Sequence, residues 1–215
     1  AASDVYKRQG WAYADQSIFN PKLHGLMDLR KKIIKRPVIT TVEVLVKPIS
    51  SKHDAFFTGF VHKPYPPIYL ELSRNAAFHS ASVIRGTEGG IIPSLRQIGK
   101  VHYYNATNEE DKMYEVKPED LEITDGSRAV DIPIDLARKK TKDKIESKVS
   151  AEDIAKATVK SGQEALSGKD GPMKSCIQLG SSIILQRMTG NNILECSKEV
   201  LKVIESGSAL KRMKS

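Results

Sequence analysis

The pattern of apolar positions predicts two strands and a helix in the middle of the chain. Residues 56–62 (FFTGFVH) and 80–85 (SASVIR) are rich in the aromatic, β-branched and small apolar residues that are typical of strands. Residues 68–77 are expected to form a short helix after a proline-rich stop at 63–67. A strand, a helix and a strand joined by short connections form a βαβ unit, so the pattern predicts an α/β fold with a partly parallel sheet.

The flanking residues predict further elements. Residues 40–46 (TTVEVLV) alternate like a strand, and residues 100–105 and 112–116 are candidates for a hairpin across an acidic loop. Asn20 is a good N-cap and Pro21 suits the first helical position. The apolar residues that follow keep helical spacing, namely Leu23, Leu26, Met27, Leu29, Ile33 and Ile34.

The C-terminal part of the chain is expected to be helical, after a charged excursion or linker at residues 124–148. Cys176 and Cys196 lie in helical segments without metal-ligand spacing, which predicts buried or half-buried thiols. An apolar face formed by Cys176, Leu179, Ile183 and Ile184 is expected to belong to the core. The predicted helices, three of which end before a glycine, are 151–166, 171–188, 193–205 and a last turn at 209–213.

A glycine-rich turn directly follows the strand at 80–85. Glycines there can adopt positive φ and let backbone amides approach a phosphate or a substrate, and Glu88 is the one carboxylate of the turn. The candidate substrate-binding residues of this turn are therefore Gly86, Thr87, Glu88 and Gly89. The plainer alternative is a tight strand exit that binds nothing.

The formal net charge of +8 favours anionic partners, either nucleic acid or phosphorylated small molecules. The cations at 30–36 fit either an anion-binding patch or the solvated last turn of a helix. No apolar run approaches the about 20 residues of a membrane span, and no segment resembles a signal peptide, so we expect no membrane partner and a cytoplasmic location. The candidate nucleic-acid-binding residues are Arg30, Lys31, Lys32, Lys35, Arg36, Lys63, Arg85 and Arg96.

Residues 1–9 (AASDVYKRQ) do not lead into the rest of the chain by any structural pattern, and we expect them to be a non-native remnant. One domain is then expected over residues 10–215, with its N-terminal portion missing.

Several short motifs follow one another in a distinctive order. They are GWAYAD at 10–15, NPKLxxLxxLR at 20–30, TGFVH at 58–62, VIRGTEG at 83–89 and ESGSALKRM at 205–213. In this order they resemble the C-terminal two-thirds of the anthranilate phosphoribosyltransferase-like proteins of glycosyltransferase family three. The resemblance implies a nucleoside phosphorylase or phosphoribosyltransferase type of α/β domain, with a mixed, mostly parallel sheet flanked by helices. It also implies a missing N-terminal helical domain and a homodimer for the full-length protein.

The resemblance assigns roles to two positions. Arg30 matches the arginine that family enzymes place against the carboxylate of anthranilate, a task that suits a guanidinium because it meets a carboxylate bidentately. Gly86 matches the glycine that opens the turn whose Asp-Glu pair binds magnesium on phosphoribosyl pyrophosphate. In this chain the pair falls on Ile91 and Ile92, which offer no oxygen to a hard cation, and Glu88 is displaced by three residues. We therefore assign no catalytic residue and no metal ligand.

Two functions are compatible with a family fold in which Ile91 and Ile92 replace the acidic pair. One is phosphoribosyl or other pentosyl transfer to a nitrogen acceptor, with magnesium and phosphoribosyl pyrophosphate as cofactor and substrate and with Arg30 orienting the acceptor. The other is a non-catalytic protein that binds nucleic acid through its basic surface. The GTEG form of the turn and residues 39–45 resemble the DNA-binding paralogues of the family more than the tryptophan-pathway enzymes. The resemblance also implies that residues 39–45 are helical, capped by Thr40, and we prefer this to the strand.

Overall fold

The computed structural model describes residues 10–33, 38–87, 90–131, 138–140, 145–147 and 149–214. The chain divides into two compact units. The first comprises residues 1–91 and 100–115, and the second comprises residues 92–99 and 116–215.

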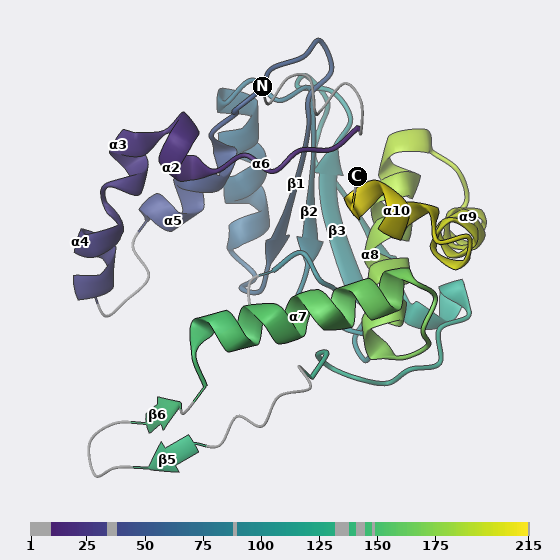
Figure 1. The fold of residues 1–215 in the computed structure, drawn as a ribbon. Coiled ribbons are helices and arrows are strands. Elements are labelled where there is room, and N and C mark those ends of the chain that lie inside the picture. Colours follow the sequence, from purple (N-terminus) through teal and green to yellow (C-terminus); the bar gives the residue numbers. More distant parts are fainter. Residues whose placement is uncertain are drawn as a thin grey trace. The chain divides into compact units, whose positions relative to one another are not determined.

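The first unit is built on a mixed sheet with the strand order β1-β2-β3-β4. Strands β1 and β2 pair in parallel, whereas β2 and β3 pair antiparallel. Helix α6 (Tyr65–Asn75) connects β1 to β2 and runs along the strands (Figure 1). The predicted α/β fold with its βαβ unit is therefore confirmed. The bounds of the strands are β1 Ala55–Phe60, β2 Ser80–Arg85, β3 Gly99–Tyr104 and β4 Lys112–Val116.

Helix α6 begins at Tyr65, inside the proline-rich stretch that predicts a stop. Pro66 and Pro67 lie in its first turn, where a missing amide hydrogen removes no bond within the helix. The helix buries Leu70, which is 1% exposed, against the sheet. The core of this unit consists of Leu45, Phe56, Phe60, Leu70, Phe78, Ala81, Val83 and Tyr104.

The N-terminal helices are shorter than the apolar spacing predicts. Asn20 is the N-cap of α3 (Pro21–His24) as predicted, since its Oδ1 accepts a hydrogen bond from the Leu23 amide at 3.2 Å. The helix does not continue to residue 34, because a turn at residues 25–26 separates α3 from α4 (Met27–Lys32). Glycine at position 25 weakens the helix at this point. A further short helix, α2 (Gln16–Phe19), precedes α3.

Residues 39–45 are helical, as the resemblance implies, and the strand that alternation predicts is wrong. They form α5 (Ile39–Val42) and the 3₁₀ helix η1 (Glu43–Leu45). Helical geometry puts Leu45 into the core, where it is 7% exposed, and this burial outweighs the β propensity of the stretch. Thr40 does not cap the helix: Val38 holds the cap position without a side-chain bond, and Thr40 is buried within the first turn.

The second unit is mainly helical. The predicted helices are all present, and Gly168, Gly190 and Gly207 follow three of them with φ values of +92°, +77° and +68°. Cys176 and Cys196 are both buried, as predicted, and both are free thiols. Within the described part of the chain, no helix is long and apolar enough to cross a membrane. The helices are η2 Pro118–Leu121, α7 Ala151–Leu166, α8 Pro172–Thr189, α9 Ile193–Glu205 and α10 Ser208–Lys214.

Residues 124–148, for which the charge pattern predicts an excursion or linker, include two short strands. β5 (Arg138–Lys140) and β6 (Ile145–Ser147) pair antiparallel as a separate two-stranded sheet.

Candidate functional site

The carboxyl ends of β1 and β2 lie at the same edge of the sheet because the two strands are parallel. Phe60 is opposite Arg85 in the register, and the Gly86 amide continues the ladder by donating to the Phe60 carbonyl at 3.0 Å. Lys63 follows β1 and is exposed, whereas Arg85 closes β2 and is half-buried. Two cations and the start of the glycine-rich turn therefore share one edge, where α/β folds commonly bind ligands.

The glycine-rich turn folds back onto β1 at Gly59. A Cβ atom on Gly59 would overlap the carbonyl group of Gly90 and would lie 2.7 Å from the Ile91 amide nitrogen. Gly59 thus has a steric reason to be glycine, since any side chain would push the turn off the strand. The turn also contains a hydrogen bond from the Gly90 amide to the Thr87 carbonyl, at 3.1 Å.

Of the predicted substrate-binding residues of the turn, Gly86 and Thr87 stand at the edge, and Glu88 and Gly89 lie outside the described residues. Ile91 is half-buried and Ile92 is 49% exposed. The described residues of the turn therefore offer a magnesium ion only hydroxyl and backbone oxygens, which do not fit the carboxylate-rich site that such a cation prefers. Among the described residues, no three His, Cys, Asp or Glu side chains are grouped so that they could hold a metal.

Arg30 forms an ion pair with Glu43. Its Nη1 lies 2.7 Å from Glu43 Oε2, and the two side chains are 24% and 17% exposed. The same nitrogen lies 3.6 Å from Met27 Sδ. The family resemblance assigns the Arg30 guanidinium to a ligand carboxylate. In this chain the guanidinium already has a carboxylate partner, Glu43 of η1. Sequence reasoning missed Glu43, although it is the one acidic residue of the TTVEVLV stretch.

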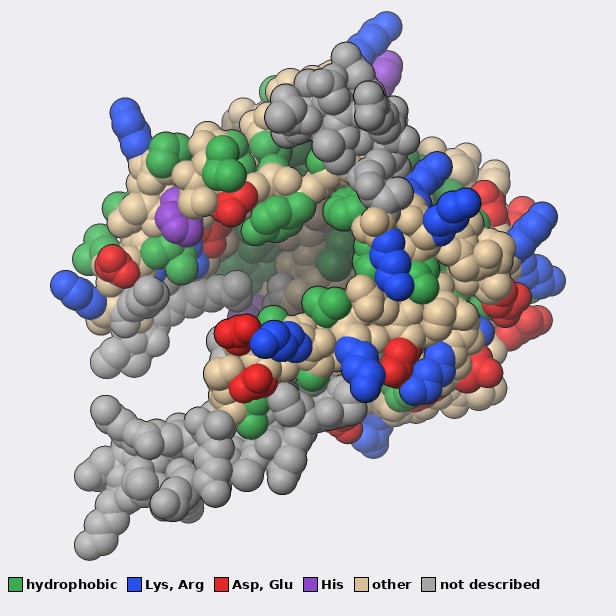
Figure 2. All heavy atoms as spheres, viewed as in Figure 1, with side chains coloured by type: hydrophobic (Ala, Val, Ile, Leu, Met, Phe, Trp, Pro, Cys, Tyr) green, Lys and Arg blue, Asp and Glu red, His purple; other side chains and the backbone are tan. Residues whose placement is uncertain are grey.

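The other predicted basic residues are only partly brought together. Lys32 is exposed on α4, which also carries Lys31, and Arg96 is exposed in the second unit. Lys35 and Arg36 lie outside the described residues. Over α7, Figure 2 shows cations interspersed with carboxylates, as in the ion pair of Lys156 with Glu152 at 2.7 Å. The described residues of α7 therefore form a surface of mixed charge.

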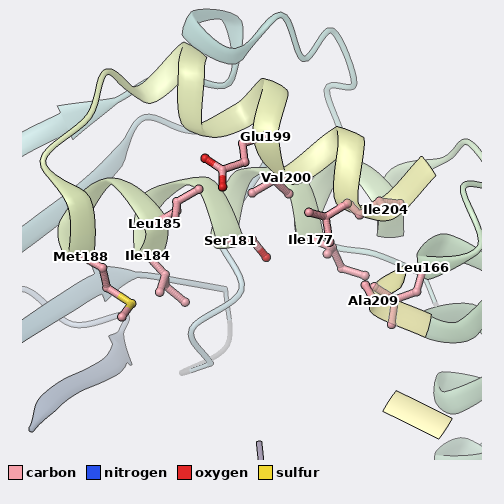
Figure 3. A pocket seen from close by; sticks show the side chains of 11 residues that line it. Leu166, Ile177, Ser181, Ile184, Leu185, Met188, Glu199, Val200, Ile204 and Ala209 are labelled. Atoms are coloured by element: carbon pink, nitrogen blue, oxygen red, sulfur yellow. The ribbon is translucent and has the colours of Figure 1, made fainter. Parts of the chain in front are cut away.

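The second unit contains an apolar pocket of about 360 Å³. Figure 3 shows aliphatic side chains of α8 and α9 around it, with Ser181 and Glu199 as the polar members and with Leu166 and Ala209 at one end. None of the residues that the sequence singles out for ligand binding lines this pocket.

Comparison with known proteins identifies the fold. No protein-family model matches the sequence. An uncharacterized protein of Aquifex aeolicus (strain VF5) is 34% identical over 82 residues, which are 38% of this chain and 26% of that protein.

Solved structures of anthranilate phosphoribosyltransferase from Saccharomyces cerevisiae are similar to this chain. A variant with Mg bound has a TM-score of 0.66 and 16% sequence identity, and the alignment covers 89% of this chain and 50% of the enzyme chain. The complex with 4-fluoroanthranilate has a TM-score of 0.65 and 18% identity, with the same coverage of 89% and 50%. The complex with PRPP and Mg has a TM-score of 0.61 and 18% sequence identity, and the alignment covers 99% of this chain and 60% of the enzyme chain.

This chain therefore spans between half and three fifths of the length of these enzymes and about a quarter of the Aquifex protein. At such identities the likeness shows the fold, which is that of a phosphoribosyltransferase-type α/β domain.

Proposed function

We propose that this chain is the α/β part of a phosphoribosyltransferase-type protein that no longer transfers a phosphoribosyl group to anthranilate. The observation that carries the proposal is the Arg30–Glu43 ion pair at 2.7 Å, which occupies the guanidinium expected to receive the acceptor carboxylate. An acceptor would have to displace Glu43 and leave that carboxylate without its cation in a mostly buried position. Ile91 and Ile92, at the positions of the family's acidic pair, support the same conclusion.

The test is a turnover assay on the full-length protein that contains this chain. Phosphoribosyl pyrophosphate, anthranilate and magnesium are supplied together, and the consumption of anthranilate is followed. We expect no consumption above the enzyme-free rate. Turnover that depends on magnesium and is lost in Arg30→Ala would refute the proposal, provided that Lys156→Ala, a surface change on α7, leaves the turnover unchanged.

A second proposal is that the edge formed by the ends of β1 and β2 binds the phosphates of nucleic acid. Among the described residues, the ion pairs of the first unit use Arg30, Lys47, Arg74, Lys100 and Lys112. Lys63 and Arg85, by contrast, take part in none within the described part of the chain. Cations that are not neutralised by their own chain are available to phosphate groups, and they share this edge with the backbone of the glycine-rich turn.

Binding to double-stranded DNA of arbitrary sequence tests this proposal. If phosphates are neutralised, the logarithm of the affinity falls linearly with the logarithm of the salt concentration, with a slope of about 0.9 per phosphate contact. The double variant Lys63→Gln with Arg85→Gln should reduce the slope by up to about 2, since each lost contact removes about one unit. Lys156→Gln, which removes a cation already paired on α7, is the matched control and should not change the slope.

Two results would remove the nucleic-acid proposal. One is an absence of binding at low salt, and the other is an affinity that does not respond to salt. If phosphoribosyl pyrophosphate displaces the DNA, the edge binds phosphorylated small molecules in competition with nucleic acid.

A further inference from the structure

The second unit contains a polar pocket of about 300 Å³ that the proposed function does not use. It lies between the end of η2, the first turns of α8 and one face of α9, and it is separate from the apolar pocket of Figure 3. Its residues include Gln178 from α8 and Ser197 from α9, which are 7% and 1% exposed. Two nearly buried polar side chains therefore line one pocket.

The amide group of Gln178 has a fixed orientation. Its Nε2 donates to the Leu121 carbonyl at 3.3 Å and to Ser197 Oγ at 2.8 Å. Because a carbonyl oxygen only accepts, the nitrogen of the amide must be the atom that faces Leu121. Gln178 Oε1 then remains as an acceptor that has no partner among the described residues and is not sealed from solvent.

Ser197 supplies the complementary group. Its Oγ accepts the bond from Gln178, and no described residue accepts the hydroxyl hydrogen of Ser197 in return. The Ser197 hydroxyl and Gln178 Oε1 are thus a donor and an acceptor on two residues that line the same pocket and are hydrogen-bonded to each other. Chemical groups that carry an acceptor beside a donor match this pair, and an amide, with its C=O and N–H, is the simplest of them.

The charges of the pocket disfavour an anion. Lys174, whose side chain is 12% exposed, is held by Asp170 at 2.9 Å and by Glu205 at 3.7 Å. Two carboxylates therefore already balance this ammonium group. The remaining charged side chains that line the pocket are the cation Lys198 and the carboxylates Glu122 and Asp125. The pocket therefore carries an excess of negative charge. These charges repel a carboxylate or a phosphate, and the need for a C=O beside an N–H is met by a neutral amide.

We infer that this pocket binds a small, neutral, planar molecule that presents an amide edge. The ligand carbonyl accepts from the Ser197 hydroxyl, and the ligand N–H donates to Gln178 Oε1. The volume of about 300 Å³ is at the lower end of the range of known ligand pockets, which suits a single ring with its substituent. The inference uses only the second unit and does not rest on the proposed function.

Nicotinamide is a suitable probe, because it carries a primary amide on a planar ring. We expect nicotinamide to bind the intact chain saturably, as measured by NMR chemical-shift changes. N,N-dimethylnicotinamide, which lacks the N–H donor, and nicotinic acid, which carries a carboxylate, should each bind at least about tenfold more weakly, because a site built for a hydrogen bond rejects ligands that lack it.

Ser197→Ala removes the hydroxyl donor and should weaken nicotinamide binding by about tenfold. Ser182→Ala is the matched control, since Ser182 is also a fully buried helical serine. Its hydroxyl donates to the backbone carbonyl of Gln178, and it does not line the pocket. The inference is overturned if nicotinamide does not bind, if the dimethylated amide or the acid binds as tightly, or if Ser182→Ala and folded Ser197→Ala weaken binding equally. The comparison of the three ligands on the unaltered chain decides the question even if Ser197→Ala does not fold.

Discussion

Replacing Gly59 by alanine tests whether the glycine-rich turn rests on β1. The new methyl group would overlap the carbonyl of Gly90, and the Ile91 nitrogen would lie at 2.7 Å, well inside the 3.4 Å at which ordinary contacts begin. Both neighbours are backbone atoms, which cannot rotate away as the end of a side chain can. The turn must therefore move off the strand, or β1 must shift within the sheet.

The cost follows from two opposing effects. Inserting a methyl group into a well-packed site costs about 1–3 kcal/mol, and replacing glycine within a strand returns about 0.5–1 kcal/mol by restricting the unfolded chain. The two effects together give a net loss of up to about 2.5 kcal/mol in the free energy of unfolding, and the overlap with backbone atoms favours the upper half of that range. The loss should be accompanied by weaker anion binding at the edge, because the displaced turn directly follows Arg85.

Urea unfolding followed by circular dichroism measures the effect through the midpoint of the transition. Gly162→Ala is the matched control, because Gly162 lies inside α7 with nothing within 4 Å of the added atom. That change should stabilise the chain by about 0.5–1 kcal/mol. If Gly59→Ala were as stable as the unaltered chain while Gly162→Ala behaved as expected, the turn would not lie against β1.

Three further predictions concern single residues of the two units. Ala77 has φ +56°, where a Cβ is strained, so Ala77→Gly should raise the free energy of unfolding by about 1 kcal/mol, measured by the urea midpoint. Tyr104→Phe should lower it by about 1–3 kcal/mol, because the fully buried hydroxyl bonds the Phe78 carbonyl at 3.1 Å and Ser73 Oγ at 3.0 Å; an unchanged midpoint would contradict this. Burial, reinforced by the charge of Asp125, raises the pKa of the Cys176 thiol from 9.0 to about 11, so the native thiol should resist Ellman's reagent at pH 9, where the unfolded chain reacts. Since the folded state holds this proton more tightly, the stabilising contribution is complete below pH 9 and is lost as the pH rises toward 11.

The elements that the sequence predicted well have local causes. The glycines at 168, 190 and 207 follow helices in a left-handed conformation that other residues adopt at a cost, so they mark three helix ends directly. The β1-α6-β2 unit follows from two apolar runs with a helix between them, and its parallel pairing follows from the crossover.

The failed predictions depend on contacts between segments that are distant in sequence. Alternation at 40–46 predicts a strand, but the burial of Leu45 among residues of β1, β2 and α6 decides for a helix. Thr40 is drawn into the interior for the same reason and does not reach the cap position. At residues 25–26 the apolar spacing continues although the helix does not, because spacing records which face is apolar and not whether the backbone bends.

The ion pair between Arg30 and Glu43 links the fold to the proposed function. Its partners are 13 residues apart on α4 and η1, and η1 exists only because residues 39–45 are helical. With the guanidinium held at 2.7 Å from this carboxylate, Arg30 contributes little net charge to a ligand, so a phosphate must find its cations elsewhere in the first unit. We propose Lys63 and Arg85 for this role, since neither has an ion-pair partner within the described residues. Glu43→Gln should consequently strengthen the binding of any anion that reaches Arg30, while anions bound only at the β1 and β2 edge should be unaffected.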